Sequence, residues 1–163
     1  MSSVYNLYLI DEEKIPEKLK GTLEEKYNQL IELVTQIGIF YETIEMREFD
    51  FIMAIEAVDW LIGKTQILPV FTFNNSPHGL LLDETDKTGD NRVFGYFNSE
   101  QVEDLYDCIK FYENFDIFSD EGDLMLEHNQ DVDIDAFEDV LNAYVSVLKK
   151  AFDTGYSIAI IHN

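Results

Sequence analysis

Apolar residues recur every three or four positions near the end of the chain, a spacing that places them on one side of a helix. The residues that set this pattern are Ile134, Phe137, Leu141, Tyr144, Leu148 and Phe152. Acidic residues crowd the first turns, while Lys149 and Lys150 lie in the last, which suits the partial charges at the two ends of a helix. Because Gly155 can adopt the left-handed conformation that ends a helix, we predict a long helix that stops there.

Two segments have the pattern of strands. Tyr156 to Ile161 is short and almost wholly apolar, which is typical of an interior strand. Val4 to Ile10 alternates, with Tyr5, Leu7 and Leu9 on one face, and this predicts a half-buried first strand. A short helical turn is expected after it, near Pro16.

A second long helix is predicted over 23–44. Thr22 and Glu25 have the spacing of a capping box at its start. The apolar positions then step by four and three residues through Leu23, Tyr27, Leu30, Val34, Ile37, Tyr41 and Ile44. Gly38 interrupts this pattern and weakens the prediction for the second half. A further apolar helix is predicted from about Phe49 to Ile62, ending at Gly63.

The middle of the chain combines strand and loop patterns. Ile67 to Phe73 is β-branched and aromatic, and Pro69 suits an edge strand or a bulge. Residues 74–92 form a long polar segment that we interpret as a loop and a candidate contact surface. Another short strand is predicted over 92–97. A helix then follows, capped by Asn98 with Gln101 or by Ser99 alone.

This order of elements predicts an α+β fold, in which a small mixed sheet of about four short strands packs against roughly four to five helices. We expect a single domain spanning 1–163, because a chain of 163 residues can bury a sizeable core. A hydrophobic content of 46% with 13% aromatic residues excludes a disordered chain.

The chain is strongly acidic, with 33 Asp and Glu against 11 Lys and Arg and a formal net charge of −22. Such a charge repels nucleic acid phosphates and anionic membranes, so we expect neither as a partner. A basic protein is the favoured macromolecular partner. Acidity that only keeps the protein soluble is the alternative, and the oligomeric state stays open.

The first residues lack the basic and long apolar regions of a signal peptide, and no stretch approaches the length of a membrane span. We therefore expect a cytoplasmic protein. Cys108 is the only cysteine, so neither an internal disulfide nor a cysteine-rich zinc site can form within the chain. We expect its thiol to be buried or half-buried rather than a nucleophile.

The densest run of carboxylates lies in 103–139, where Lys110 is the only lysine or arginine. Asp131, Asp133 and Asp135 match the opening of a calcium-binding EF-hand loop. Ala136 and Asn142 occupy the positions that need glycine and a bidentate glutamate, so a calcium site is not expected. Two interpretations stay open: helix caps on a solvated face, and a surface that docks a basic partner.

Catalytic patterns are weak. His78, His128 and His162 are too scattered for metal-ligand spacing, and neither a phosphate-binding glycine loop nor a Gly-x-Ser-x-Gly elbow occurs. We expect no catalytic residues, no cofactor and no metal. Trp60, near a helix end, is expected to fill the core with its N–H bonded to a neighbour. An exposed interface position is the alternative for Trp60.

Four short features occur together: the strand Tyr5 to Ile10, Asp59-Trp60-Leu61 before Gly63, Phe97 to Val102 opening a helix, and the ending from Leu141 to Ile161. Their combination resembles the YfbM-like family, small bacterial proteins grouped as a domain of unknown function. This chain departs from the family pattern, because the Trp-bearing segment is shorter and the Gly/Pro-rich middle is replaced. The resemblance implies an α+β fold and supplies no catalytic residues.

We hypothesise that the chain is a non-catalytic protein that binds a basic partner, in the form of an immunity protein or inhibitor that neutralises a toxin such as a nuclease. The expected contact residues are Asp116, Asp120, Glu121, Asp123, Asp131 and Asp133, with Phe115 and Phe118 as anchors. The alternative is a small-ligand-binding protein or an enzyme with a pocket near His78 and the 74–92 loop.

Overall fold

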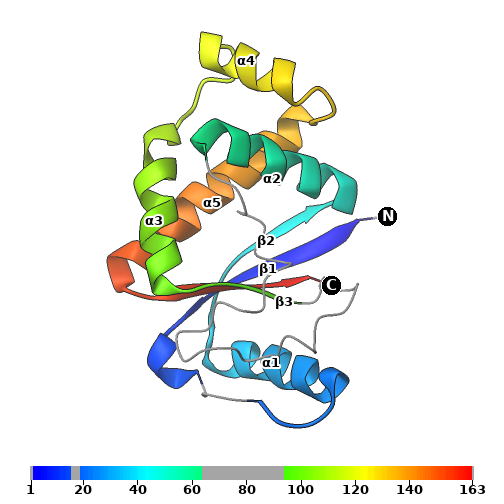
Figure 1. Ribbon diagram of the computed structural model, residues 1–163, viewed down its shortest axis with the longest axis vertical. Coiled ribbons are helices and arrows are strands. Elements are labelled where there is room, and N and C mark those ends of the chain that lie inside the picture. Colours follow the sequence, from blue (N-terminus) through cyan, green and yellow to red (C-terminus); the bar gives the residue numbers. More distant parts are fainter. Residues whose placement is uncertain (1, 16–18, 64–93, 163) are drawn as a thin grey trace.

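The computed structural model describes residues 2–15, 19–63 and 94–162 (Figure 1). Within these ranges the chain forms five α-helices, two short 3₁₀ helices labelled η, and four strands. In chain order they are β1 (Ser3–Ile10), η1 (Glu12–Lys14), α1 (Leu23–Ile37), β2 (Ile39–Met46), α2 (Glu48–Ile62), β3 (Phe94–Phe97), α3 (Ser99–Ile109), η4 (Lys110–Tyr112), α4 (Asp120–His128), α5 (Ile134–Thr154) and β4 (Ser157–His162).

The four strands form one sheet in the order β2-β1-β4-β3. The predicted α+β class is confirmed, but each described strand pair is antiparallel, so the expectation of a mixed sheet is wrong. The apolar strand β4 lies in the interior, between β1 and β3, as its composition predicts. A bulge between Leu7 and Tyr8 shifts the register between β1 and β2.

Helices cover both faces of the sheet. Figure 1 shows α2, α3 and α5 on one side and α1 on the other. Alternate residues of each strand contribute to the cores on the two sides of the sheet, because successive side chains in a strand point to opposite faces. Leu7 and Ile160 belong to the larger core under α2, α3 and α5. Tyr96 and Ile161 belong to the smaller core under α1.

The helix predicted over 23–44 is wrong in its second half. The helix α1 ends at Ile37, and Gly38 has an extended backbone with φ −76° and ψ 147°. Residues 39–46 then form β2, which pairs with β1. Their β-branched and aromatic composition suits a strand. The three-and-four spacing continues through Tyr41 and Ile44 by coincidence, and strand pairing decides the outcome.

Most local signals for element ends are confirmed. The capping boxes of Thr22 with Glu25 and of Asn98 with Gln101 are both formed. Two glycines end helices in the left-handed conformation, Gly63 after α2 and Gly155 after α5. The strand predicted over 67–73 and the loop predicted over 74–92 lie outside the described residues.

Candidate functional site

Residues 113–139, here called the acidic lobe, contain no lysine or arginine. The lobe runs from the end of η4 through α4 to the first turns of α5, and α4 lies at the end of the molecule opposite α1 (Figure 1). Its carboxylate side chains are all exposed: Glu113, Asp116, Asp120, Glu121, Asp123, Glu127, Asp131, Asp133, Asp135, Glu138 and Asp139. The predicted charged residues therefore share one exposed region.

Helix α4 is attached to the rest of the protein by a few specific contacts. Met125 is fully buried, and Gly122 lies so close to Ile117 that a Cβ at this glycine would be 2.0 Å from the Ile117 carbonyl oxygen. The Tyr112 hydroxyl lies 3.0 Å from the Leu61 carbonyl oxygen and 2.9 Å from Glu121 Oε1. Burial, followed by the hydrogen bond to Glu121, raises the pKa of Tyr112 to about 12.

Two of the predicted contact residues also hold the local backbone. Asp133 caps α5, where its Oδ2 accepts a hydrogen bond of 2.9 Å from the Ala136 amide. Asp116 Oδ1 accepts a hydrogen bond of 2.9 Å from the Phe118 amide. The side-chain carboxylates of Asp120, Asp123 and Asp131 make no hydrogen bond or ion pair with a described residue. These three carboxylates can meet a partner without breaking an internal contact.

The two predicted anchors lie in different environments. Phe118 is 85% exposed. Phe115 is partly buried and packs edge-on against Tyr112 and Phe137, with ring centroids 5.7 Å and 6.2 Å apart. Only Phe118 therefore offers most of its ring to a partner, because Phe115 already contributes to the larger core.

Trp60 does not fill the core, so the leading prediction for this residue is wrong. It is 39% exposed and stacks on His128, with ring centroids 4.9 Å apart and planes at 23°. Leu124, one turn before His128, is 50% exposed. Apolar residues surround helix α2, so sequence periodicity alone does not show which side of it faces the core. The structure thus adds an apolar patch of Trp60, Leu124 and His128 beside the carboxylates.

In the described part of the chain, few positive charges lie beside the lobe; they include Arg47, Lys110 and, near Glu113, Lys149 and Lys150. Arg47 holds Asp50 through two hydrogen bonds of 2.8 Å and 3.0 Å, which lower the pKa of the Asp50 carboxyl. Lys110 pairs with Asp107 at 3.4 Å. Exposed acids also line α3, so the acidic surface continues beyond the lobe. On the opposite face of the sheet, lysines occur among the acids of η1 and α1.

The remaining candidate residues lie apart from the lobe. Cys108 is half-buried on α3, as expected for a structural thiol. His162 stacks on Tyr5 with ring centroids 4.4 Å apart. His78 and the predicted 74–92 loop, which carry the small-ligand alternative, lie outside the described residues.

Comparisons with known proteins add no assignment, because no family model, curated protein or solved structure matches the chain. Within residues 2–15, 19–63 and 94–162, no group of three or more His, Cys, Asp or Glu side chains is arranged to hold a metal ion. None of the helices in these same ranges is both long enough and apolar enough to cross a bilayer.

Proposed function

We propose that this chain is a non-catalytic binding protein whose acidic lobe docks onto a basic protein. The specific form that we propose is a cytoplasmic immunity protein or inhibitor that neutralises a basic toxin such as a nuclease. The observation that supports it most directly is the exposed lobe of residues 113–139, which combines many carboxylates with no lysine or arginine. The resemblance of the whole chain to the YfbM-like family is also part of this proposal, and it bears on the fold alone.

Charge and apolar anchors have different tasks in this proposal. Dense exposed carboxylates attract a cationic protein and accelerate encounter, and they pair with its lysines and arginines. Affinity depends more on a few desolvated side chains, among which aromatic residues are enriched. Phe118 and the Trp60 patch supply such side chains, and both border the charged surface.

The same charge argues against other partners. A net charge of −22 repels nucleic acid and anionic membranes over several ångströms at physiological salt. A high negative charge suits an inhibitor of a nuclease, because its carboxylates can bind the cationic surface that otherwise binds the phosphates of nucleic acid. Such a protein needs a rigid scaffold and no active site of its own.

The proposal is tested by capturing proteins from an extract of the native host with the purified chain. A lobe variant carries Asp120→Asn, Asp123→Asn, Glu127→Gln and Asp131→Asn. A matched control carries Glu13→Gln, Glu32→Gln, Glu100→Gln and Glu103→Gln, which are exposed acids outside the lobe. Both variants have the same net charge, so a difference between them reports the position of the charge.

We expect the wild type and the control to capture one basic protein whose binding weakens steeply with salt, and the lobe variant to capture far less of it. Co-expression of that protein with the wild type should restore growth that the protein alone arrests. Equal capture by the two variants, or a captured partner that is not basic, would refute docking through the lobe.

A further inference from the structure

Among the described residues, the strand β2 is an outer strand of the sheet and pairs only with β1. No backbone hydrogen bond from its other side to a described residue is found. It is eight residues long, and Ile39 and Phe40 at its start are each 55% exposed. A long open edge of this kind is a template for a further strand, and proteins use it to bind extended peptides.

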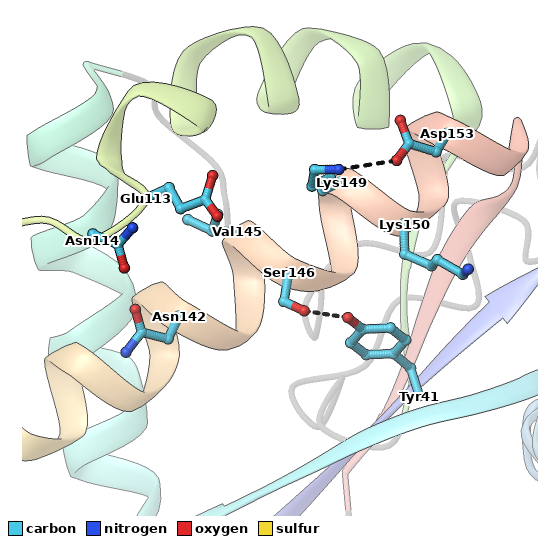
Figure 2. Close-up of a pocket in the computed structure, with 9 residues that line it drawn as sticks. All are labelled: Tyr41, Glu113, Asn114, Asn142, Val145, Ser146, Lys149, Lys150 and Asp153. Atoms are coloured by element: carbon cyan, nitrogen blue, oxygen red, sulfur yellow. Dashed lines mark hydrogen bonds and ion pairs between the residues drawn. The ribbon is translucent and has the colours of Figure 1, made fainter.

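A groove follows this edge, with helix α5 as its opposite wall. It consists of two cavities of about 460 Å³ and about 250 Å³. Asn142 and Ser146 line both cavities, so the two adjoin along α5, and together they are called the groove. Figure 2 shows the larger cavity, where the Tyr41 hydroxyl hydrogen-bonds to Ser146 Oγ and joins the strand to the helix.

The two ends of the groove differ in charge. Glu42 on β2 and Asp139 on α5 line the smaller cavity. Burial and the nearby charge of Asp139 raise the pKa of the Glu42 carboxyl. Neither carboxylate has a hydrogen bond or an ion pair with a described residue. The larger cavity has two acids, Glu113 and Asp153, and two cations, Lys149 and Lys150, and Lys149 pairs with Asp153 at 3.3 Å (Figure 2).

We propose that this groove binds an extended segment of the basic partner, which adds to β2 as a fifth strand and places a lysine or arginine between Glu42 and Asp139. A carboxylate further along the segment would then lie near Lys150. This inference rests on the proposed function for the basic character of the partner. It adds to the proposed function that β2 holds an extended segment of the partner. Asp139, the last residue of the acidic lobe, also lines the groove, so the two surfaces adjoin.

Charge complementarity selects this occupant over a second copy of the chain. Antiparallel pairing of β2 with β2 of another copy, in the register that sets Glu42 opposite Glu45, would place like charges across the strand pair, which is destabilising. Each copy also carries a net charge of −22. An extended segment with a central cation instead neutralises the two unpaired carboxylates.

The test uses a synthetic peptide, acetyl-Thr-Val-Lys-Val-Thr-Val-Thr-Asp-amide, titrated into the full-length chain and followed by the NMR signals of the β2 amides. One control peptide has glutamine in place of lysine. A second keeps the lysine but carries N-methyl groups on alternate amides, which removes the backbone donors that a strand needs. The protein variants are Glu42→Gln with Asp139→Asn, and, as a matched control, Glu100→Gln with Glu103→Gln, two exposed acids outside both the lobe and the groove.

We expect the β2 signals to shift with the parent peptide, and the Kd to rise about tenfold for either control peptide and for the Glu42→Gln, Asp139→Asn variant. The Glu100→Gln, Glu103→Gln variant should bind as the wild type does. The inference is overturned if no β2 signal shifts, or if the N-methylated peptide binds equally well. It is also overturned if sedimentation shows dimers and the β2 signals shift with protein concentration in the absence of peptide. The lobe variant of the capture experiment changes no residue that lines the groove, so failure of the peptide titration is distinguishable from failure of the capture experiment.

Discussion

The indole of Trp60 on α2 stacks on the imidazole of His128 on α4, with the ring centroids 4.9 Å apart. The stack joins two helices that are far apart in the sequence. It lies where the acidic lobe contacts the layer of α2, α3 and α5. Leu124 exposes half of its surface one turn earlier on α4. The position of α4, and with it the shape of the proposed docking surface, therefore depends partly on this ring pair.

The stack can be observed directly, because Trp60 is the only tryptophan in the chain. We expect His128→Ala to expose the indole face that the imidazole covers, and so to shift the Trp60 emission to longer wavelength and increase quenching by acrylamide. The control is Glu127→Ala, which alters the neighbouring exposed residue and should leave the emission unchanged. Identical spectra for wild type and His128→Ala would mean that the rings are not stacked in solution.

Asp133 and Asp131 are neighbouring exposed carboxylates with different tasks. Asp133 caps α5 through the amide of Ala136, whereas Asp131 makes no such bond. We expect Asp133→Ala to lower the free energy of unfolding by about 1 kcal/mol, the usual cost of losing an N-cap. Asp131→Ala should change it by less than about 0.5 kcal/mol. Urea denaturation of the two variants separates a capping role from a general effect of charge, and equal losses would contradict the assignment.

Gly38 marks the boundary at which α1 gives way to β2. A Cβ at this position would be 2.3 Å from the Val34 carbonyl oxygen and 3.2 Å from Tyr8 Cβ. We therefore expect Gly38→Ala to lower the free energy of unfolding by more than about 1 kcal/mol, although alanine is the better helix former. Gln36→Ala, an exposed change on the same helix, should have little effect. A stabilised Gly38→Ala variant would show instead that the helix continues beyond Ile37.

Three phenols resist ionisation in the folded protein. Burial raises the pKa of Tyr144 and Tyr96 above the ordinary value, and burial together with Glu121 raises that of Tyr112 to about 12. The unfolded chain loses these protons near pH ~10. Between that pH and the raised pKa values the folded state holds more protons, so the free energy of unfolding falls as the pH rises.

Stability should thus be unaffected by these groups below about pH 10 and should decline above it. We expect an ultraviolet titration to show that some of the nine tyrosines ionise only when the far-ultraviolet circular dichroism is lost. Tyr112→Phe should reduce the loss of stability at alkaline pH. Ionisation of all tyrosines in one step, with the circular dichroism intact, would contradict the burial of these hydroxyls.

The candidate site was only partly predictable. The charge of the acidic lobe is a property of composition, and so is its lack of lysine and arginine. Phe115 and Phe118 stand three residues apart in the same acidic stretch, and no periodicity separates them. The structure places Phe115 against Phe137 and leaves Phe118 85% exposed, because the turn held by Asp116 directs the chain between them.

Signals that depend on neighbouring residues were determined by the sequence alone: the two capping boxes, the left-handed stops at Gly63 and Gly155, and the interior strand β4. Each of these needs only a few adjacent side chains and the backbone geometry that they favour. The tertiary structure decided that 39–46 pairs with β1 as a strand, that Trp60 stays partly exposed, and that two cavities lie between β2 and α5. Pairing and packing join residues that are distant in the chain, and their free energy overrides the local preference that a spacing pattern expresses.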